Sequence, residues 1–166
     1  MKREYLSPHI ELRRLNWIGP LTVLSSVTVV HLVRFVAVAL LHPEPTFMPL
    51  NVLPPIVDTV VFVTLAVFVF RRIVSGRPAL FWGLLGARFF VLGPIHAYRA
   101  IALRVLLISF LPDVGLALLH RAAWTYAFAL MSMHIAAWAV CVLMLTKLTT
   151  TNAPQPEILR QTHAND

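Results

Sequence analysis

The chain has 166 residues, of which 58% are hydrophobic and only 13% are charged. A soluble domain carries about 25% charged residues and could not bury this much apolar surface, so the composition argues against a soluble globular protein. A net charge of +7 would suggest a nucleic-acid partner in a soluble protein. Here the basic residues lie beside the hydrophobic segments, where they determine topology, and we expect no nucleic-acid partner.

Four apolar runs follow one another along the chain, at residues 17–41, 52–70, 97–111 and 122–146. A transmembrane helix needs roughly 20 apolar residues, and the first run is too long for the core of a signal peptide. Prolines between positions 43 and 55 predict a loop at residues 42–55, and Pro112-Asp113 is expected to close the third span. The predicted domains are a cytoplasmic segment at 1–16, a four-helix transmembrane domain at 17–147 and a disordered cytoplasmic tail at 148–166.

The segment 79–95 is apolar but short, and Gly83, Gly86, Arg88 and Pro94 interrupt it. A segment of this kind suits the membrane interface or a re-entrant position better than a full crossing. We therefore predict an all-α fold: an integral membrane four-helix bundle with an extra short interfacial or re-entrant helix before the third span. A five-span alternative, in which 79–95 crosses and Arg88 is buried, stays open.

The distribution of basic residues favours four spans over five. With four spans, the positive-inside rule places both termini in the cytoplasm. We expect a multi-pass protein of the inner (plasma) membrane of a bacterial cell. Only Arg121 would then lie on the outer side. The basic residues on the cytoplasmic side would be Lys2, Arg3, Arg13, Arg14, Arg71, Arg72, Arg77, Arg88, Arg99, Lys147 and Arg160.

Several stretches share their order and spacing with one known family. They are Pro-Leu-Asn-Val-Leu-Pro-Pro at 49–55, Arg77-Pro78, Tyr-Arg-Ala-Ile-Ala-Leu at 98–103, Ser-Phe-Leu-Pro-Asp at 109–113 and Ala-Leu-Met-Ser-Met-His at 129–134. In these the chain resembles a family of uncharacterised bacterial four-pass integral membrane proteins, a domain of unknown function. The resemblance covers about residues 20–146 and departs from the pattern by extra residues between Arg77-Pro78 and Tyr98. It implies the four-pass fold and no particular activity.

Two charged residues inside the apolar runs are candidates for an ion pair. Arg34 in the first span and Asp58 in the second both fall outward of the membrane midplane, on neighbouring antiparallel helices. Charged groups in lipid face the bundle interior and pair with one another, so we predict an Arg34–Asp58 ion pair. It would act as a structural lock, or it would take part in proton or ion movement.

The polar and charged side chains whose burial in lipid costs free energy gather in the outer half of the predicted bundle. We therefore predict an outward-facing pocket or polar cluster there, because ligand sites combine apolar walls with a few convergent polar groups. Its predicted members are His31, Arg34, Asp58, Asp113 and Tyr126.

Four histidines form a second pattern. His31 and His134 fall near the centres of their spans, while His42 and His120 fall near the outer ends, at spacings close to whole helical turns. Membrane b-type cytochromes bind haem with comparable pairs, so these four are candidate haem b ligands. Bulky neighbours such as Phe35 and Leu130 leave no slot for a porphyrin. The alternative is that His31 and His134 hydrogen-bond across the bundle.

The sequence contains no motif for catalysis. Cys141 is the single cysteine, so thiol-exchange chemistry by paired cysteines is excluded, and we expect it to be a small buried hydrophobe. We predict a non-enzymatic multi-pass membrane protein with an accessory, structural or small-ligand-binding role, without a metal or cofactor. An electron carrier with haem b and a small proton-linked transporter are the alternatives. The expected partner is the lipid bilayer, with homo-oligomers and other membrane proteins left open.

Overall fold

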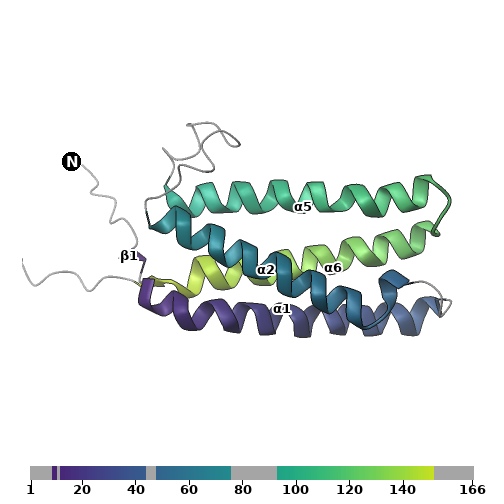
Figure 1. Cartoon of the computed structure of the whole chain (residues 1–166), viewed down its shortest axis with the longest axis horizontal. Helices are drawn as coiled ribbons and strands as arrows, with labels where there is room; N and C mark the ends of the chain where they lie inside the picture. Colours follow the sequence, from purple (N-terminus) through teal and green to yellow (C-terminus); the bar gives the residue numbers. More distant parts are fainter. Residues whose placement is uncertain (1–8, 11, 44–47, 76–92, 152–166) are drawn as a thin grey trace, which may run out of the picture.

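A computed structural model of the chain describes residues 9–10, 12–43, 48–75 and 93–151. Its four long helices are α1 (Leu12–Leu41), α2 (Leu53–Val74), α5 (Pro94–Leu118) and α6 (Trp124–Leu143). They lie side by side along one axis (Figure 1), and the predicted all-α four-helix bundle is confirmed. Most of the predicted short helix at 79–95 lies outside the described residues.

Three short elements and one extension complete the described structure. A 3-10 turn, η1 (Met48–Leu50), precedes α2, and the π-helical segment η2 (Met144–Leu148) continues α6. Two-residue strands, β1 (His9–Ile10) and β2 (Thr150–Thr151), pair antiparallel with His9 opposite Thr151. This pairing ties the beginning of α1 to the end of η2, so both described ends of the chain lie at the same end of the bundle.

All four helices are long and apolar enough to cross a membrane, judged by length and composition. Their outer surfaces carry large apolar side chains, such as Phe35 at 69% exposed, Leu107 at 56% and Phe128 at 60%. In water such a surface would drive aggregation, whereas in a bilayer it meets lipid tails of the same polarity. The structure therefore fits a multi-pass membrane protein.

The helices extend beyond the apolar runs that predicted them. α1 begins at Leu12, inside the predicted N-terminal segment 1–16, and α2 continues past Arg71 to Val74. The prediction that Pro112-Asp113 closes the third span is wrong, because α5 continues through Pro112 to Leu118. Within lipid no water can solvate a broken helix end, so a helix continues through a proline and loses a hydrogen bond. As a result, Asp113 lies inside a helix.

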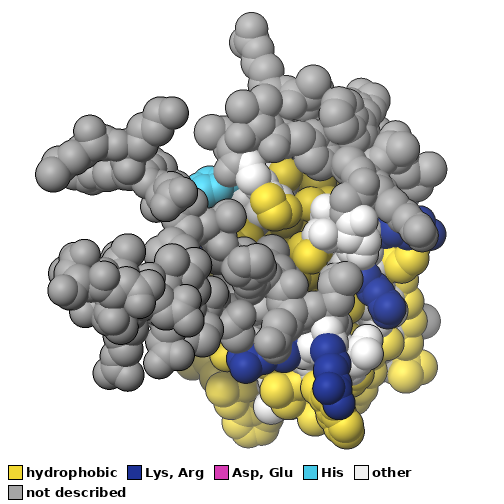
Figure 2. Space-filling model, turned by 90° about the vertical axis from the view of Figure 1, so that its left-hand side faces the viewer, with side chains coloured by type: hydrophobic (Ala, Val, Ile, Leu, Met, Phe, Trp, Pro, Cys, Tyr) yellow, Lys and Arg dark blue, Asp and Glu magenta, His cyan; other side chains and the backbone are white. Residues whose placement is uncertain are grey.

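Charge is distributed unevenly between the two ends of the bundle. We call the end that holds Leu12 and Thr151 the termini end, and the end that holds the connections 42–52 and 119–123 the two-loop end. Figure 2 views the termini end and shows Lys and Arg side chains around it. The exposed basic residues at that end are Arg13, Arg14, Arg71, Arg72, Arg99 and Lys147. The two acidic residues within the described ranges, Asp58 and Asp113, both lie toward the two-loop end.

Helix α1 packs closely on its neighbours α2 and α6 because one of its faces carries small residues. A Cβ atom added at Gly19 would lie 3.0 Å from Val67 Cγ1 on α2. Thr22 and Ser26 continue this face and are fully buried, and the Thr22 hydroxyl donates to the Ile18 carbonyl at 2.7 Å. Small residues permit the close helix approach that holds membrane bundles together.

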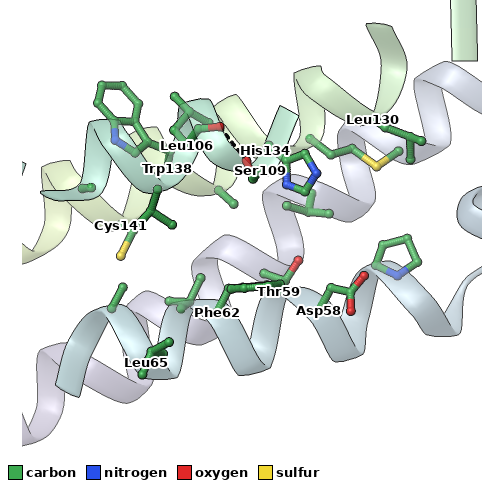
Figure 3. Close-up of a pocket in the computed structure, with 18 of the residues that line it drawn as sticks. Asp58, Thr59, Phe62, Leu65, Leu106, Ser109, Leu130, His134, Trp138 and Cys141 are labelled. Atoms are coloured by element: carbon green, nitrogen blue, oxygen red, sulfur yellow. Dashed lines mark hydrogen bonds between the residues drawn. The ribbon is translucent and has the colours of Figure 1, made fainter. Parts of the chain in front are cut away.

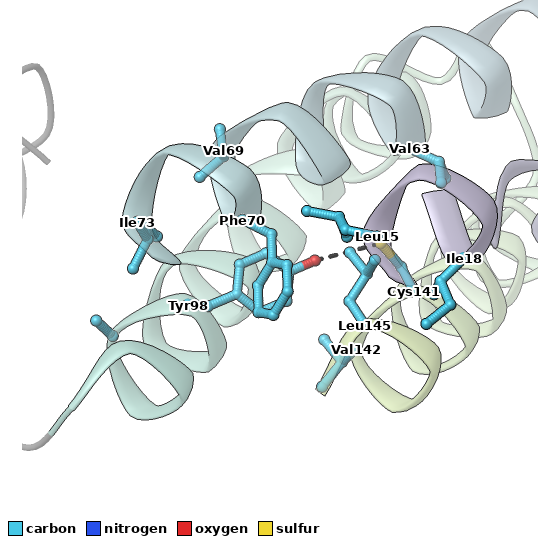
Figure 4. Close-up of a cluster of buried hydrophobic side chains, with 11 residues drawn as sticks. Leu15, Ile18, Val63, Val69, Phe70, Ile73, Tyr98, Cys141, Val142 and Leu145 are labelled. Atoms are coloured by element: carbon cyan, nitrogen blue, oxygen red, sulfur yellow. Dashed lines mark hydrogen bonds between the residues drawn. The ribbon is translucent and has the colours of Figure 1, made fainter. Parts of the chain in front are cut away.

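The main core lies toward the termini end, where all four helices contribute (Figure 4). Phe70 and Tyr98, both fully buried, meet edge to face with ring centroids 4.8 Å apart and planes at 72°. The Tyr98 hydroxyl lies 3.3 Å from the Cys141 sulfur, within hydrogen-bond distance. Cys141 is buried in this core, as expected from the sequence. The core then continues through Leu15, Ile18, Val63, Val69, Ile73, Ala97, Val142 and Leu145.

Candidate functional site

A groove of about 290 Å³ runs between α2, α5 and α6 (Figure 3). It forms because α5 packs against α6 along its length but against α2 less closely. Most of its walls are apolar side chains from stripes at helical spacing. These include Phe62, Leu65 and Val69 on α2, Ile101, Val105 and Leu106 on α5, and Leu130, Met133, Trp138 and Cys141 on α6.

The groove is long and opens sideways. On α5 the lining residues extend from Tyr98 to Leu116, which corresponds to about 27 Å at roughly 1.5 Å of rise per residue. Several lining side chains are half exposed on the outer surface of the helices: Phe62 at 55%, Leu65 at 54% and Val105 at 50%. In a bilayer this surface faces the acyl chains. The groove is therefore accessible from the lipid and nearly as long as the hydrocarbon core is thick.

Polar side chains gather toward the two-loop end of the groove. Asp58 and Thr59 come from α2, Ser109 and Asp113 from α5, and His134 from α6. Figure 3 shows Asp58 and Thr59 on one side and Ser109 and His134 on the other. Asp58 and Asp113 each lie five residues inside the end of their helix, about 8 Å from the two-loop end at ~1.5 Å per residue. We call these five residues the polar end of the groove.

Asp113 is the most buried member of the polar end. Its side chain is 7% exposed, and its Oδ2 atom lies 3.3 Å from Nε2 of His134, whose side chain is 35% exposed. That distance allows an ion pair when the imidazole is protonated, but the geometry does not satisfy a hydrogen bond. Oδ2 consequently has no hydrogen-bond partner among the described residues. A buried carboxylate oxygen without a hydrogen bond is costly, and such groups are retained at functional sites.

A second buried polar atom of the groove also lacks a partner. Trp138 lies one helical turn beyond His134 on α6, and its indole Nε1 is buried with no acceptor in the part of the chain that the structure describes. The Ser109 hydroxyl differs, since it donates to the Leu106 carbonyl at 2.7 Å and keeps its lone pairs free to accept. The groove thus presents one unsatisfied acceptor and one unsatisfied donor.

The Arg34–Asp58 ion pair expected from the sequence is not formed between these two described residues. Arg34 instead donates from Nε to the Leu50 carbonyl at 2.8 Å, and Asp58 lines the groove. The physical reason is the length of the connection 42–52. Its described part includes the turn η1, whose Leu50 carbonyl lies at the guanidinium and accepts one of its hydrogen bonds.

The predicted outer-half cluster is brought together only in part. Asp58 and Asp113 line the groove, whereas His31, Arg34 and Tyr126 do not. Tyr126 packs against the smaller core near the two-loop end, formed by Val30, Leu50, Leu130 and Met133, and His31 is half-buried on α1. Of the five predicted members, the structure therefore brings only Asp58 and Asp113 together along the groove.

The four candidate haem ligands do not share the regular helical faces that motivated them. His42 and His120 follow the ends of α1 and α5 in the left-handed conformation, with φ of 45° and 53°, and both are exposed. The spacing from His31 to His42, and from His120 to His134, therefore does not measure turns of one helix. His134 lines the groove and His31 does not. No group of three His, Cys, Asp or Glu side chains that could hold a metal occurs in the described ranges.

Three groove residues, Thr59, Ser109 and Trp138, were not predicted as part of any site, and His134 was predicted only as a candidate haem ligand or as a hydrogen-bond partner of His31. His134 could have been found by the reasoning applied to Arg34 and Asp58, because it and Asp113 lie on neighbouring helices joined by the short connection 119–123. Trp138 carries no such signal, since an indole in an apolar span is usually only a packing residue.

In the comparisons with known proteins, no family model, no curated protein and no solved structure matches this chain.

Proposed function

We propose that this protein is a non-enzymatic multi-pass protein of the cell membrane that holds one elongated, largely apolar molecule in the groove between α2, α5 and α6. The observation that supports this proposal most directly is the shape and chemistry of the groove. It has apolar walls over most of its length, polar groups at one end and a sideways opening to lipid. Ligand sites have this combination of apolar walls and a few convergent polar groups.

The charge distribution supports an orientation for the bundle. Exposed Lys and Arg residues gather at the termini end (Figure 2), and the positive-inside rule assigns such an end to the cytoplasm. The polar end of the groove then lies in the outer half of the membrane. A reporter protein that is active only in the cytoplasm should be active when fused after Lys147, whereas a reporter that is active only after export should be inactive there. An exported reporter at this position would reverse the proposed orientation.

Quenching of Trp138 fluorescence tests the groove itself. The chain has four tryptophans, so changing Trp17, Trp82 and Trp124 to Phe leaves Trp138 as the only reporter. Bromine atoms quench indole on contact, and a single-chain amphiphile brominated at mid-chain should therefore quench Trp138 with saturation as its mole fraction rises. A quenching curve that stays linear, as for random collisions with lipid, would contradict a site.

Two alanines on α6 provide a matched pair of variants. Ala137 lines the groove, while Ala139 lies between the exposed Ile135 and Leu143 on the outer face. Ala137→Phe should fill the groove and abolish saturable quenching, and Ala139→Phe should leave it unchanged. Equal effects of the two substitutions would mean that the quencher acts from the bulk lipid.

A proton-linked function is the second candidate, and one specific contact favours it. Asp113 is buried in a candidate span with its carboxylate 3.3 Å from the His134 imidazole. Buried carboxylate and imidazole groups in membranes are typical parts of proton relays. Proteoliposomes that contain a pH-sensitive dye would reveal proton movement, and His134→Gln should abolish it. A wild-type protein that moves no protons would exclude this candidate.

A further inference from the structure

We propose that the polar end of the groove recognises the primary ammonium headgroup of a single-chain amphiphile that carries no phosphate. This inference rests on the proposed function, because it requires the groove to hold an elongated molecule. It adds the charge and the hydrogen-bonding character of the headgroup, which determine the class of ligand.

The charged groups that line the groove determine the sign of the headgroup. Among the described residues, two carboxylates line the groove, Asp58 on α2 and Asp113 on α5, at similar depth from the two-loop end. None of the described residues that line it is a lysine or an arginine. Arg34, the nearest basic residue along α1, is bonded to the Leu50 carbonyl instead. A phosphate, sulfate or carboxylate headgroup would therefore meet like charge without a guanidinium or lysine ammonium to bind it.

The unsatisfied atom at the polar end determines what the headgroup must donate. Asp113 Oδ2 belongs to a side chain that is more than nine-tenths buried, and it has no hydrogen-bond partner in the described structure. A hydrogen bond between an ionised donor and a carboxylate is about twice as strong as a neutral one. A primary ammonium offers three N–H donors, while a quaternary ammonium offers none. Thr59 and Ser109 supply further oxygens that can accept from the same group.

The contact with His134 does not supply the hydrogen bond that Asp113 Oδ2 lacks. Its Nε2 lies 3.3 Å from Asp113 Oδ2 without hydrogen-bond geometry, and its ring is about one-third exposed at the groove. If the imidazole is protonated, it balances one of the two carboxylates and leaves the other as net negative charge. In either protonation state, the polar end is more favourable for a cation than for an anion.

The size of the groove limits the tail to one chain. Its volume of about 290 Å³ lies at the lower limit of roughly 300–1,000 Å³ found for small-molecule sites. The apolar stripes of α2 and α5 leave a path from the polar end toward Tyr98 that one extended chain can follow. A diacyl phospholipid would need room for a second chain and would bring its phosphate close to the two aspartates.

The experiment compares four amphiphiles that share one brominated hexadecyl chain and differ only in headgroup: primary amine, alcohol, trimethylammonium and sulfate. Trp138 in the single-tryptophan protein reports binding of each in the same detergent. A charge-assisted hydrogen bond contributes roughly 1.5–3 kcal/mol, which corresponds to about tenfold or more in affinity. The amine should therefore half-saturate quenching at a mole fraction at least about tenfold below the sulfate and below the trimethylammonium compound.

Two substitutions assign the preference to the polar end. Asp113→Asn should reduce the amine-to-sulfate preference about tenfold, and Asp58→Asn, at an exposed position that can change without loss of the fold, should reduce it in the same direction. Ser132→Ala on the exposed face of α6 is the control and should leave the preference unchanged.

Each contrary outcome has a distinct meaning. Sulfate binding as tightly as the amine would overturn the headgroup inference while leaving the groove proposal intact. Trimethylammonium binding as tightly as the amine would overturn the hydrogen bond to Asp113, since charge alone would then suffice. Saturable quenching by none of the four would instead refute the proposed function from which this inference starts.

Discussion

Phe70→Ala is the substitution whose effect can be estimated most directly from the packing. Phe70 is fully buried in the core at the termini end and meets the Tyr98 ring edge to face at 4.8 Å. In a soluble protein, truncating a buried phenylalanine costs about 3–5 kcal/mol. Part of that cost comes from transfer between water and the core. A membrane protein does not incur that part, because its separated helices remain in lipid that is as apolar as the core.

What remains is the cost of the cavity and of the lost aromatic pair. A residual cavity of about 100 Å³, at roughly 24 cal/mol per Å³, costs about 2.4 kcal/mol. The edge-to-face pair contributes about 0.5–1.5 kcal/mol in addition. We therefore expect Phe70→Ala to destabilise the bundle by about 3–4 kcal/mol, at least about a hundredfold in the unfolding equilibrium.

The single cysteine provides the assay. Cys141 is 5% exposed and belongs to the same core as Phe70, but it also lines the groove, so the assay uses a maleimide reagent too large and polar to enter the groove from the lipid, which should reach Cys141 only when the bundle opens. When opening is in rapid equilibrium, the labelling rate in mild detergent should rise with the unfolding equilibrium, at least about a hundredfold for Phe70→Ala. If labelling requires the whole bundle to open, the labelling rates of the wild type and of Phe70→Ala should rise equally steeply with added denaturing detergent. A rate for Phe70→Ala that does not depend on the detergent would mean that the reagent reaches the sulfur through a local opening.

Phe35→Ala is the matched control, because Phe35 is 69% exposed on α1. A substitution at the outer surface should change stability by less than about 0.5 kcal/mol. If Phe35→Ala accelerates labelling as much as Phe70→Ala does, the separation into core and lipid-facing surface is wrong. The outer face of α1 would then be covered by another protein surface.

Five further substitutions address the polar groups and the helix ends. Asp113→Asn and His134→Gln should be coupled in a double-mutant cycle by about 0.5–2 kcal/mol, measured by Cys141 labelling. Strictly additive effects would show that the 3.3 Å contact between the two side chains contributes nothing to stability. Arg34→Ala should cost about 1–3 kcal/mol because it leaves a buried carbonyl without its donor, while Asp58→Asn should cost less than about 0.5 kcal/mol, with no coupling between them. His42→Gly should stabilise the bundle by up to about 1 kcal/mol, since glycine adopts a φ of 45° without strain, and slower labelling is the expected measurement.

The architecture could be predicted from the sequence because its cause is local. Four apolar runs require four helices wherever water is absent, because only a helix satisfies its own backbone hydrogen bonds in lipid. The third run, at 97–111, is shorter than the roughly 20 residues that a span needs. The helix ends were less predictable. Pro112 is a stop signal in water but not in lipid, and for that reason α5 is longer than predicted and Asp113 is internal.

The candidate site was predictable only where the connection between helices is short. The connection 119–123 fixes α5 beside α6, so the sequence places Asp113 and His134 on neighbouring helices, although their 3.3 Å contact also depends on how the two helices pack. The connection from 42 to 52 is longer, and its described part includes the turn η1. Its Leu50 carbonyl reaches Arg34, which no residue count along the two helices could show. The groove also depends on how far α5 stands from α2, and this separation is set by the packing of all four helices together.

The sideways opening of the groove determines how its occupancy should be measured. Because Phe62, Leu65 and Val105 are half exposed on the helix surface, a ligand of the proposed kind would enter from the bilayer without crossing water. Its concentration is then a mole fraction among lipids, and a modest affinity suffices for a compound that makes up a few per cent of the membrane. Dilution of the aqueous buffer would leave such a site filled, while added detergent would empty it. Purification in excess detergent would therefore remove the ligand, whereas extraction in small discs of native membrane would keep it bound.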